Sequence, residues 1–171
     1  MINTIETSKF KPNDCVQFFS INNTQKELLS RQALAYVLNE TATDKYLKNV
    51  LDHIPEEIKN KLKIRKINRK RTAYSFESLI GIAIVLTLHR QGVYITKACE
   101  FLDQIIKKEP ELISGLWSGS INHARYISIS AKGVDIVEDW SGLSFSITRH
   151  VICVEHIYLD LKTRWLNLFD D

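Results

Sequence analysis

The sequence predicts an α+β protein that is mainly α, and three observations support this prediction. Apolar residues recur at helical spacing in several segments between residues 24 and 106. Among these segments lies a strongly basic run, residues 59–71, in which apolar residues separate the cations as in a two-stranded ribbon. The last fifty residues contain short alternating segments that are typical of strands. We therefore expect an N-terminal arm (1–23), a helical domain with a basic hairpin (24–111) and a small α/β C-terminal segment (112–171).

The first part of the helical domain is predicted to be a pair of helices. The run Thr24-Gln25-Lys26-Glu27 has the pattern of a capping box, which predicts a helix that continues to residue 38. Thr41 or Thr43 can cap a second, short helix over residues 44–52. Two short helices joined by a tight polar turn indicate a helix-turn-helix.

The basic run, residues 59–71, is predicted to form a hairpin after one further helical turn at residues 55–60. The run holds eight of the 23 basic residues and no acidic one, so the rest of the chain carries 15 basic and 20 acidic residues. Leu62, Ile64 and Ile67 are interleaved with the cations, which predicts one apolar and one basic face. A solvated, flexible run is the alternative. Concentrated positive charge of this kind attracts polyanions.

Two helices are predicted after the hairpin, whose return strand is expected at residues 71–76. Ser75 can cap the first helix, and residues 79–88 are apolar apart from a Gly and a Thr, which predicts a buried central helix. A second, amphipathic helix is predicted over residues 95–106.

The C-terminal segment is predicted to contain strands at residues 126–130, 134–138 and 143–148. Its tail, residues 151–168, has two interpretations, because its apolar residues fit both a helical seam and an alternating strand. Asp160 could cap a short final helix. In either case the tail is expected to pack on the core or on a second subunit.

Composition excludes several classes of protein. The first fourteen residues show no secretory signal and the three cysteines suggest no disulfide framework, so we expect a cytoplasmic protein without a membrane partner. No phosphate-binding loop or hydrolase motif is present, so we expect neither an enzyme nor a cofactor. His150, Cys153 and His156 could share a helix face and bind a metal, but packing roles are more common and we expect no metal.

The region from Thr43 to Leu102 resembles the MerR-like winged helix-turn-helix family of DNA-binding domains. In that family the second helix carries a Thr-x-Arg-Tyr pattern, and residues 43–46 read Thr-Asp-Lys-Tyr. In that family the hairpin, called the wing, is followed by Tyr-Ser and then, at fixed intervals, by an aliphatic residue, a turn glycine and an aliphatic residue that opens a helix. Here Tyr74-Ser75 is followed at those intervals by Leu79, Gly92 and Ile95. This chain departs from the family in having Lys45 for the Arg, a longer basic stretch and no directly following coiled-coil helix.

The resemblance implies a sequence-specific DNA-binding transcriptional regulator, with the second helix in the major groove and the hairpin on phosphates or in the minor groove. We expect it to bind a palindromic duplex as a homodimer, and truncation after Ser118 to leave a folded monomer with weaker DNA affinity. The alternative is an adaptor whose winged helix docks an acidic partner or RNA polymerase. The residues expected to contact DNA are Thr43, Lys45, Tyr46, Lys48, Asn49, Arg65, Lys66, Arg69, Lys70 and Arg71.

Overall fold

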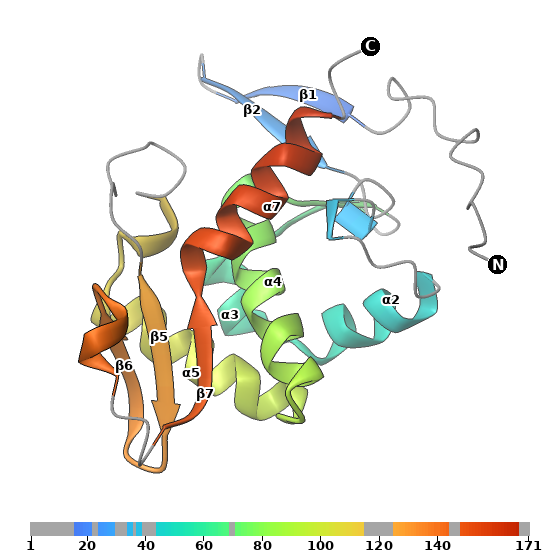
Figure 1. Ribbon diagram of the computed structural model, residues 1–171. Coiled ribbons are helices and arrows are strands. Elements are labelled where there is room, and N and C mark those ends of the chain that lie inside the picture. Colours follow the sequence, from blue (N-terminus) through green and yellow to red (C-terminus); the bar gives the residue numbers. More distant parts are fainter. Residues whose placement is uncertain are drawn as a thin grey trace, which may run out of the picture.

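The protein is α+β and mostly helical, with a central helix surrounded by the other elements (Figure 1). This computed structural model describes residues 16–21, 24–29, 34–35, 37–38, 44–68, 71–114, 125–143 and 148–167. The helices are α2 (Asp44–His53), α3 (Glu56–Lys61), α4 (Phe76–Arg90), α5 (Ile95–Lys108), a short 3-10 helix η2 (Trp140–Gly142) and α7 (Val154–Leu166). The strands are β1 (Val16–Ile21), β2 (Thr24–Leu29), β3 (Arg65–Asn68), β4 (Arg71–Ala73), β5 (Tyr126–Ser130), β6 (Gly133–Val137) and β7 (Thr148–Cys153).

Helix α4 is the centre of the core, as the sequence predicts. The hydroxyl of Ser75 accepts a hydrogen bond from the backbone N–H of Ser78 at 3.2 Å, which fixes the start of the helix. From residue 79 to residue 88 every residue except Thr87 is buried, because neighbouring elements cover the helix on all sides. The predicted amphipathic helix is confirmed as α5, which buries one face that includes Leu102 and Ile105.

The helix predicted to start at Thr24 is wrong. Residues 24–29 form strand β2, which pairs in antiparallel fashion with β1 from Ile21 opposite Thr24 to Val16 opposite Leu29. In the structure, strand β1 satisfies the backbone hydrogen-bonding groups of this segment. In the predicted helix, the side chains of the capping box would have satisfied the first of its N–H groups. Helical backbone is described later, at residues 34, 35 and 37.

The C-terminal sheet has the strand order β6-β5-β7, with both pairings antiparallel. Strands predicted at residues 126–130 and 134–138 are confirmed as β5 and β6. The strand predicted at residues 143–148 is wrong at its start, because Leu143 lies in no strand and β7 begins at Thr148; residues 144–147 lie outside the described residues.

The helical interpretation of the tail is correct from Val154 onward, whereas the strand interpretation holds only as far as Cys153. The first residues form β7, and α7 follows directly from Val154. Asp160 does not cap this helix. It lies inside α7 and pairs with Arg164 one turn later, at 2.7 Å.

Helix α7 packs on the core of its own chain beside α4 (Figure 1). Val154 and Leu161 are buried in the same apolar cluster as α4 and α5. At its far end the guanidinium of Arg164 donates to the backbone carbonyl of Val37 at 3.2 Å. The tail therefore covers α4 and reaches the backbone of Val37 within one protomer. In the described part of the chain, no helix is both long enough and apolar enough to cross a membrane.

Candidate nucleic-acid interface

Helix α2 presents a polar face to solvent and an apolar face to the core. Leu47 and Val50 are fully buried, whereas Lys45, Lys48 and Asn49 are exposed. Within the described residues, neither lysine makes an ion pair. An exposed helix face with uncompensated donors can contact base edges or phosphate oxygens.

Tyr46 has a different position from the three exposed residues of α2. Its ring is half-buried and stacks on His89 at the end of α4, with 6.1 Å between ring centroids and 19° between the planes. The His89 ring also lies 2.9 Å, Nδ1 to oxygen, from the Val93 carbonyl. Tyr46 therefore holds α2 against α4 through this ring contact.

The segment between α3 and the hairpin is built on a Schellman motif. Lys63 has a φ of 56°, and its N–H donates to the Asn60 carbonyl, while the Ile64 N–H donates to the Lys59 carbonyl. This pattern satisfies the last carbonyls of α3 and turns the chain sharply into β3. Leu62, which was predicted to alternate within the hairpin, instead closes α3 and is buried.

Leu62 packs directly on Gly81 in the middle of α4. A Cβ atom placed on Gly81 would overlap the Leu62 side chain, and Leu62 is only 2% exposed. The glycine therefore allows the entry to the hairpin to lie close against the central helix.

Gly81→Ala is expected to lower the free energy of unfolding by about 1 kcal/mol. Overpacking costs roughly 1–3 kcal/mol, and the better helix propensity of Ala offsets about 1 kcal/mol of it. Urea denaturation measures the loss. Combining Gly81→Ala with Leu62→Val should give a smaller loss than the sum of the two single changes. A Gly81→Ala protein that is more stable than wild type, with additive effects, contradicts this packing.

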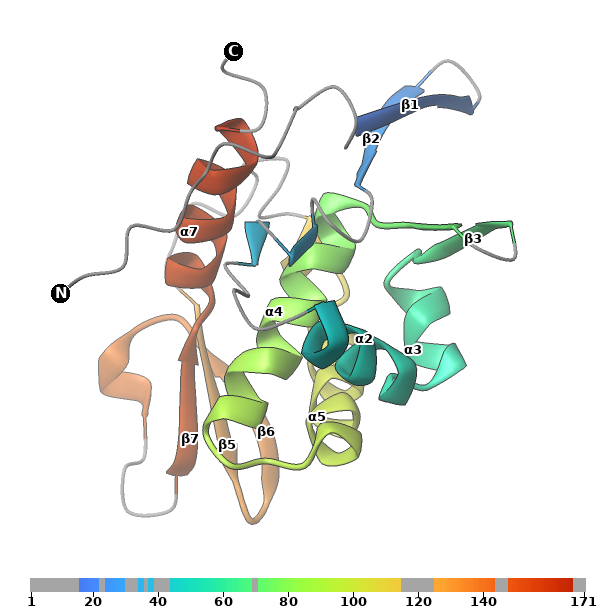
Figure 2. The same ribbon diagram turned by 90° about the vertical axis from the view of Figure 1, so that its right-hand side faces the viewer.

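The predicted hairpin is confirmed as β3 and β4, which pair in antiparallel fashion (Figure 2). Arg65 lies opposite Ala73 and Lys66 opposite Thr72, but the next pair is Asn68 with Arg71, so β3 carries one extra residue in a bulge. The return strand ends at residue 73, earlier than the predicted residue 76.

The prediction that this hairpin has one apolar and one basic face is wrong. Alternate residues of a strand share a face, so Ile64 and Lys66 lie together, and with Thr72 they line a hollow against α2 and α3. Arg65 lies on the opposite face and is exposed. Arg69 and Lys70 lie outside the described residues, as does Thr43, and only the backbone of Arg71 is described.

Four of the five cations in residues 59–71 whose side chains the structure describes pair with carboxylates of the same chain. Lys59 and Lys66 both lie near Glu56, at 3.7 and 3.9 Å, and Lys63 pairs with Glu77 at 2.7 Å. The fourth is Lys61, which contacts Asp103 of α5 and lies 2.8 Å from Glu57. Among the hairpin cations whose side chains the structure describes, Arg65 forms no ion pair. The basic run therefore presents a weaker positive field than its sequence suggests.

Asp103 connects α3 to α5. Hydrogen bonds from Lys107, at 2.6 Å, and from Lys61 lower the pKa of this carboxyl below its ordinary value of 3.8. Hydrogen bonds to Asp103 and then to Glu57 raise the pKa of Lys61 above 10.5. This pairing fixes the helix from which the hairpin starts.

Asp103→Asn is expected to lower the Tm by about 2 °C at neutral pH. Because the pKa of Asp103 is lowered by folding, its contribution is present above pH 3.8 and disappears as the pH falls through the folded pKa. The Tm of the variant should therefore approach that of wild type as the pH is lowered toward 3. Glu57→Gln, which changes the other and more exposed partner of Lys61, should have a smaller effect. A Tm difference that is constant with pH contradicts the pairing.

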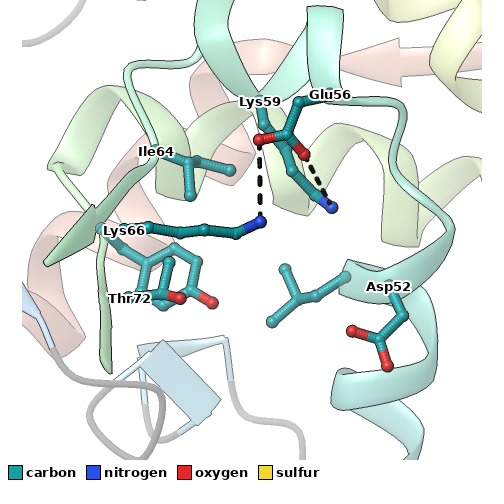
Figure 3. A pocket seen from close by; sticks show the side chains of 8 residues that line it. Asp52, Glu56, Lys59, Ile64, Lys66 and Thr72 are labelled. Atoms are coloured by element: carbon teal, nitrogen blue, oxygen red, sulfur yellow. Dashed lines mark ion pairs between the residues drawn. The ribbon is translucent and has the colours of Figure 1, made fainter. Parts of the chain in front are cut away.

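The hollow between α2, α3 and the hairpin has a volume of about 150 Å³ (Figure 3). Leu51 and Asp52 reach it from α2, Glu56 and Lys59 from α3, and Ile64, Lys66, Thr72 and Tyr74 from the hairpin and the residue that follows it. Helix α2 and the hairpin, which sequence reasoning placed in one interface, therefore do border a common space. Sequence reasoning missed Glu56 as a member of this site, although its spacing of three residues from Lys59 could have indicated it.

The residues considered for a metal do not form a site. His150 and Cys153 lie on β7 and His156 lies on α7, and within the described ranges no three His, Cys, Asp or Glu side chains gather as metal ligands would. The His150 ring instead lies 3.0 Å, Nδ1 to Oε1, from the Gln91 side chain.

No protein-family model matches the chain, and no curated protein is significantly similar to it in sequence.

Proposed function

We propose that the protein is a transcriptional regulator that binds duplex DNA through α2 and the hairpin β3–β4, in the manner of a winged helix. The observation that carries this proposal is the exposed face of α2, where Lys45, Lys48 and Asn49 have no charged partner within the described chain, beside a basic hairpin. Such a helix can read the major groove while a hairpin contacts the flanking backbone. Arg65, on the outer face of the hairpin, would contact phosphate or the minor groove.

The internal supports of this surface are consistent with precise recognition. Tyr46 stacked on His89, and Leu62 packed on Gly81, fix the two elements to the same helix, α4. A rigid surface loses less conformational entropy on binding than a mobile one.

We further propose that the protein binds a palindromic site as a homodimer, with half-sites about 34 Å apart. The buried seam of α7 is used within one protomer, so the dimer would form through another surface. Among the described residues, Tyr94 and Leu159 are the large apolar side chains with high exposure, at 82% and 50%. Analytical ultracentrifugation with and without the duplex tests this assembly, and a monomer in both conditions rejects it.

Selection of duplexes from a random pool, followed by a salt titration of the best one, tests the proposed function. The three exposed cations Lys45, Lys48 and Arg65 alone should give a log–log slope of about −2.7 per protomer, at about −0.9 per neutralised phosphate. A palindromic consensus with a steep slope supports a regulator. No binding to any duplex at low salt rejects it in favour of the adaptor that docks an acidic protein.

A further inference from the structure

The carboxylate of Glu56, which lines the hollow, bridges two ammonium groups (Figure 3). Its Oε2 atom is 3.7 Å from the Lys59 Nζ, and its Oε1 atom is 3.9 Å from the Lys66 Nζ. The two cations come from different elements, α3 and β3, so one anion joins the helix to the hairpin. The position between them is therefore a place where an anion is favoured.

Glu56 holds this place only loosely. Both distances are at the long end for ion pairs, and the side chains of Glu56 and Lys66 are 62% and 73% exposed. Exposed pairs of this kind stabilise a fold very little, because water screens them and two long side chains lose freedom. A stronger anion can therefore displace the carboxylate with little cost to the fold.

The hollow also offers a hydroxyl donor on its hairpin side. Thr72 lines it on the same hairpin face as Lys66, and within the described residues its hydroxyl has no hydrogen-bond partner. The competing charge is Asp52, which lines the hollow from α2 and is drawn apart from the Glu56 carboxylate (Figure 3). Two cations and a free hydroxyl are the donors that proteins use for backbone phosphates.

We propose that the lysine end of this hollow is a subsite for one phosphate of the DNA backbone, and that Glu56 occupies it in the free protein. This inference rests on the proposed function, which it deepens. On binding, the non-bridging phosphate oxygens accept from Lys59 and Lys66, Thr72 is a further donor on the hairpin side, and the Glu56 carboxylate turns out to solvent. Glu56 thus competes with every phosphate backbone for this subsite. Binding is then favoured for those duplexes that also form contacts with the exposed face of α2.

Glu56→Gln and Glu57→Gln make a matched pair of variants for the test. Both remove one negative charge from the first turn of α3, but Glu57 pairs with Lys61 and does not line the hollow. A long-range electrostatic effect would be the same in both variants. Competition for the subsite would appear in Glu56→Gln alone.

Fluorescence anisotropy with a labelled 20-base-pair duplex, over a series of salt concentrations, measures the affinity of each variant. Glu56→Gln should bind about three- to tenfold more tightly than wild type, and Glu57→Gln less than about twofold, with the log–log slope of Glu56→Gln steeper by at most about 0.9. The gain should disappear when Lys66→Gln is added, because the competitor acts through that lysine. Circular dichroism melting confirms that the variants are folded.

Two results would overturn the inference while leaving the proposed function intact. The first is that wild type binds the duplex and that Glu56→Gln and Glu57→Gln gain affinity equally. The second is that the gain of Glu56→Gln persists when Lys66→Gln is added. Failure of wild type to bind any duplex would instead reject the proposed function.

Discussion

Replacing Lys45, Lys48 and Arg65 together by Ala is expected to weaken duplex binding by roughly 100-fold or more at moderate salt. These three side chains are exposed and have no ion-pair partner among the described residues, so they can neutralise phosphate or donate to bases without first breaking a contact. The log–log salt slope should fall by about 2.7 per protomer, because three counterions fewer are released. Anisotropy titrations at several salt concentrations measure both quantities.

A control with the same change of net charge is available on other surfaces of the molecule. Lys108 at the end of α5, Lys132 in the turn between β5 and β6, and Lys162 on α7 are all exposed. Their triple replacement by Ala should change affinity by less than about threefold, because charges more than a Debye length from the duplex are screened. Equal losses in the two triple variants would show that only net charge matters, and would remove α2 from the interface.

Truncation after Ser118 is expected to abolish cooperative folding, which reverses the prediction made from sequence. The missing part contains β5, β6, β7 and α7, whose buried residues belong to the same apolar cluster as α4 and α5. Six large apolar side chains would be lost from that cluster: Ile127, Ile129, Val134, Ile152, Val154 and Leu161.

The free energy of burial that truncation removes is large enough to unfold the remaining chain and not merely to destabilise it. Burial of one such side chain stabilises by about 1.5–3 kcal/mol, so six contribute on the order of 10 kcal/mol. This sum is comparable to the entire stability of an ordinary domain, about 5–15 kcal/mol. Loss of α7 would also expose the face of α4 that it covers.

Thermal melting followed by circular dichroism, with dye binding to detect exposed apolar surface, measures the effect of truncation. A chain that ends at Asn167 is the control, because it keeps all of α7 and should melt cooperatively. Addition of a separate peptide of residues 119–171 should restore some structure to the truncated chain. A sharp melting transition for the truncated chain alone would show that residues 1–118 fold independently.

The elements that sequence predicted correctly are those specified by local patterns. Helix α4 has a capping serine and an apolar run too continuous for a surface helix, and α5 has a clear amphipathic period. The helix predicted from Thr24 failed because its capping box competes with a strand partner, Val16–Ile21, that the periodicity of the segment does not reveal. The two residues Asn22-Asn23 between those strands were a usable signal, since Asn favours tight hairpin turns.

The candidate site was predictable in its positive charges but not in their partners. The exposed face of α2 follows from its period, and the basic hairpin from its alternation. Glu77 and Asp103, however, come from α4 and α5, and only the fold brings them to Lys63 and Lys61. The extra residue in β3 could not be predicted either, because a bulge changes which side chains share a face without changing the composition of the strand.

That extra residue also has a consequence for the path of the ribbon. Ile67 stands between Lys66, which faces Thr72, and Asn68, which faces Arg71. A chain lacking one residue at this point could keep both pairs and simply straighten the ribbon. Deletion of that residue should therefore leave Lys66 opposite Thr72 and remove the bend and added twist that a bulge gives its strand.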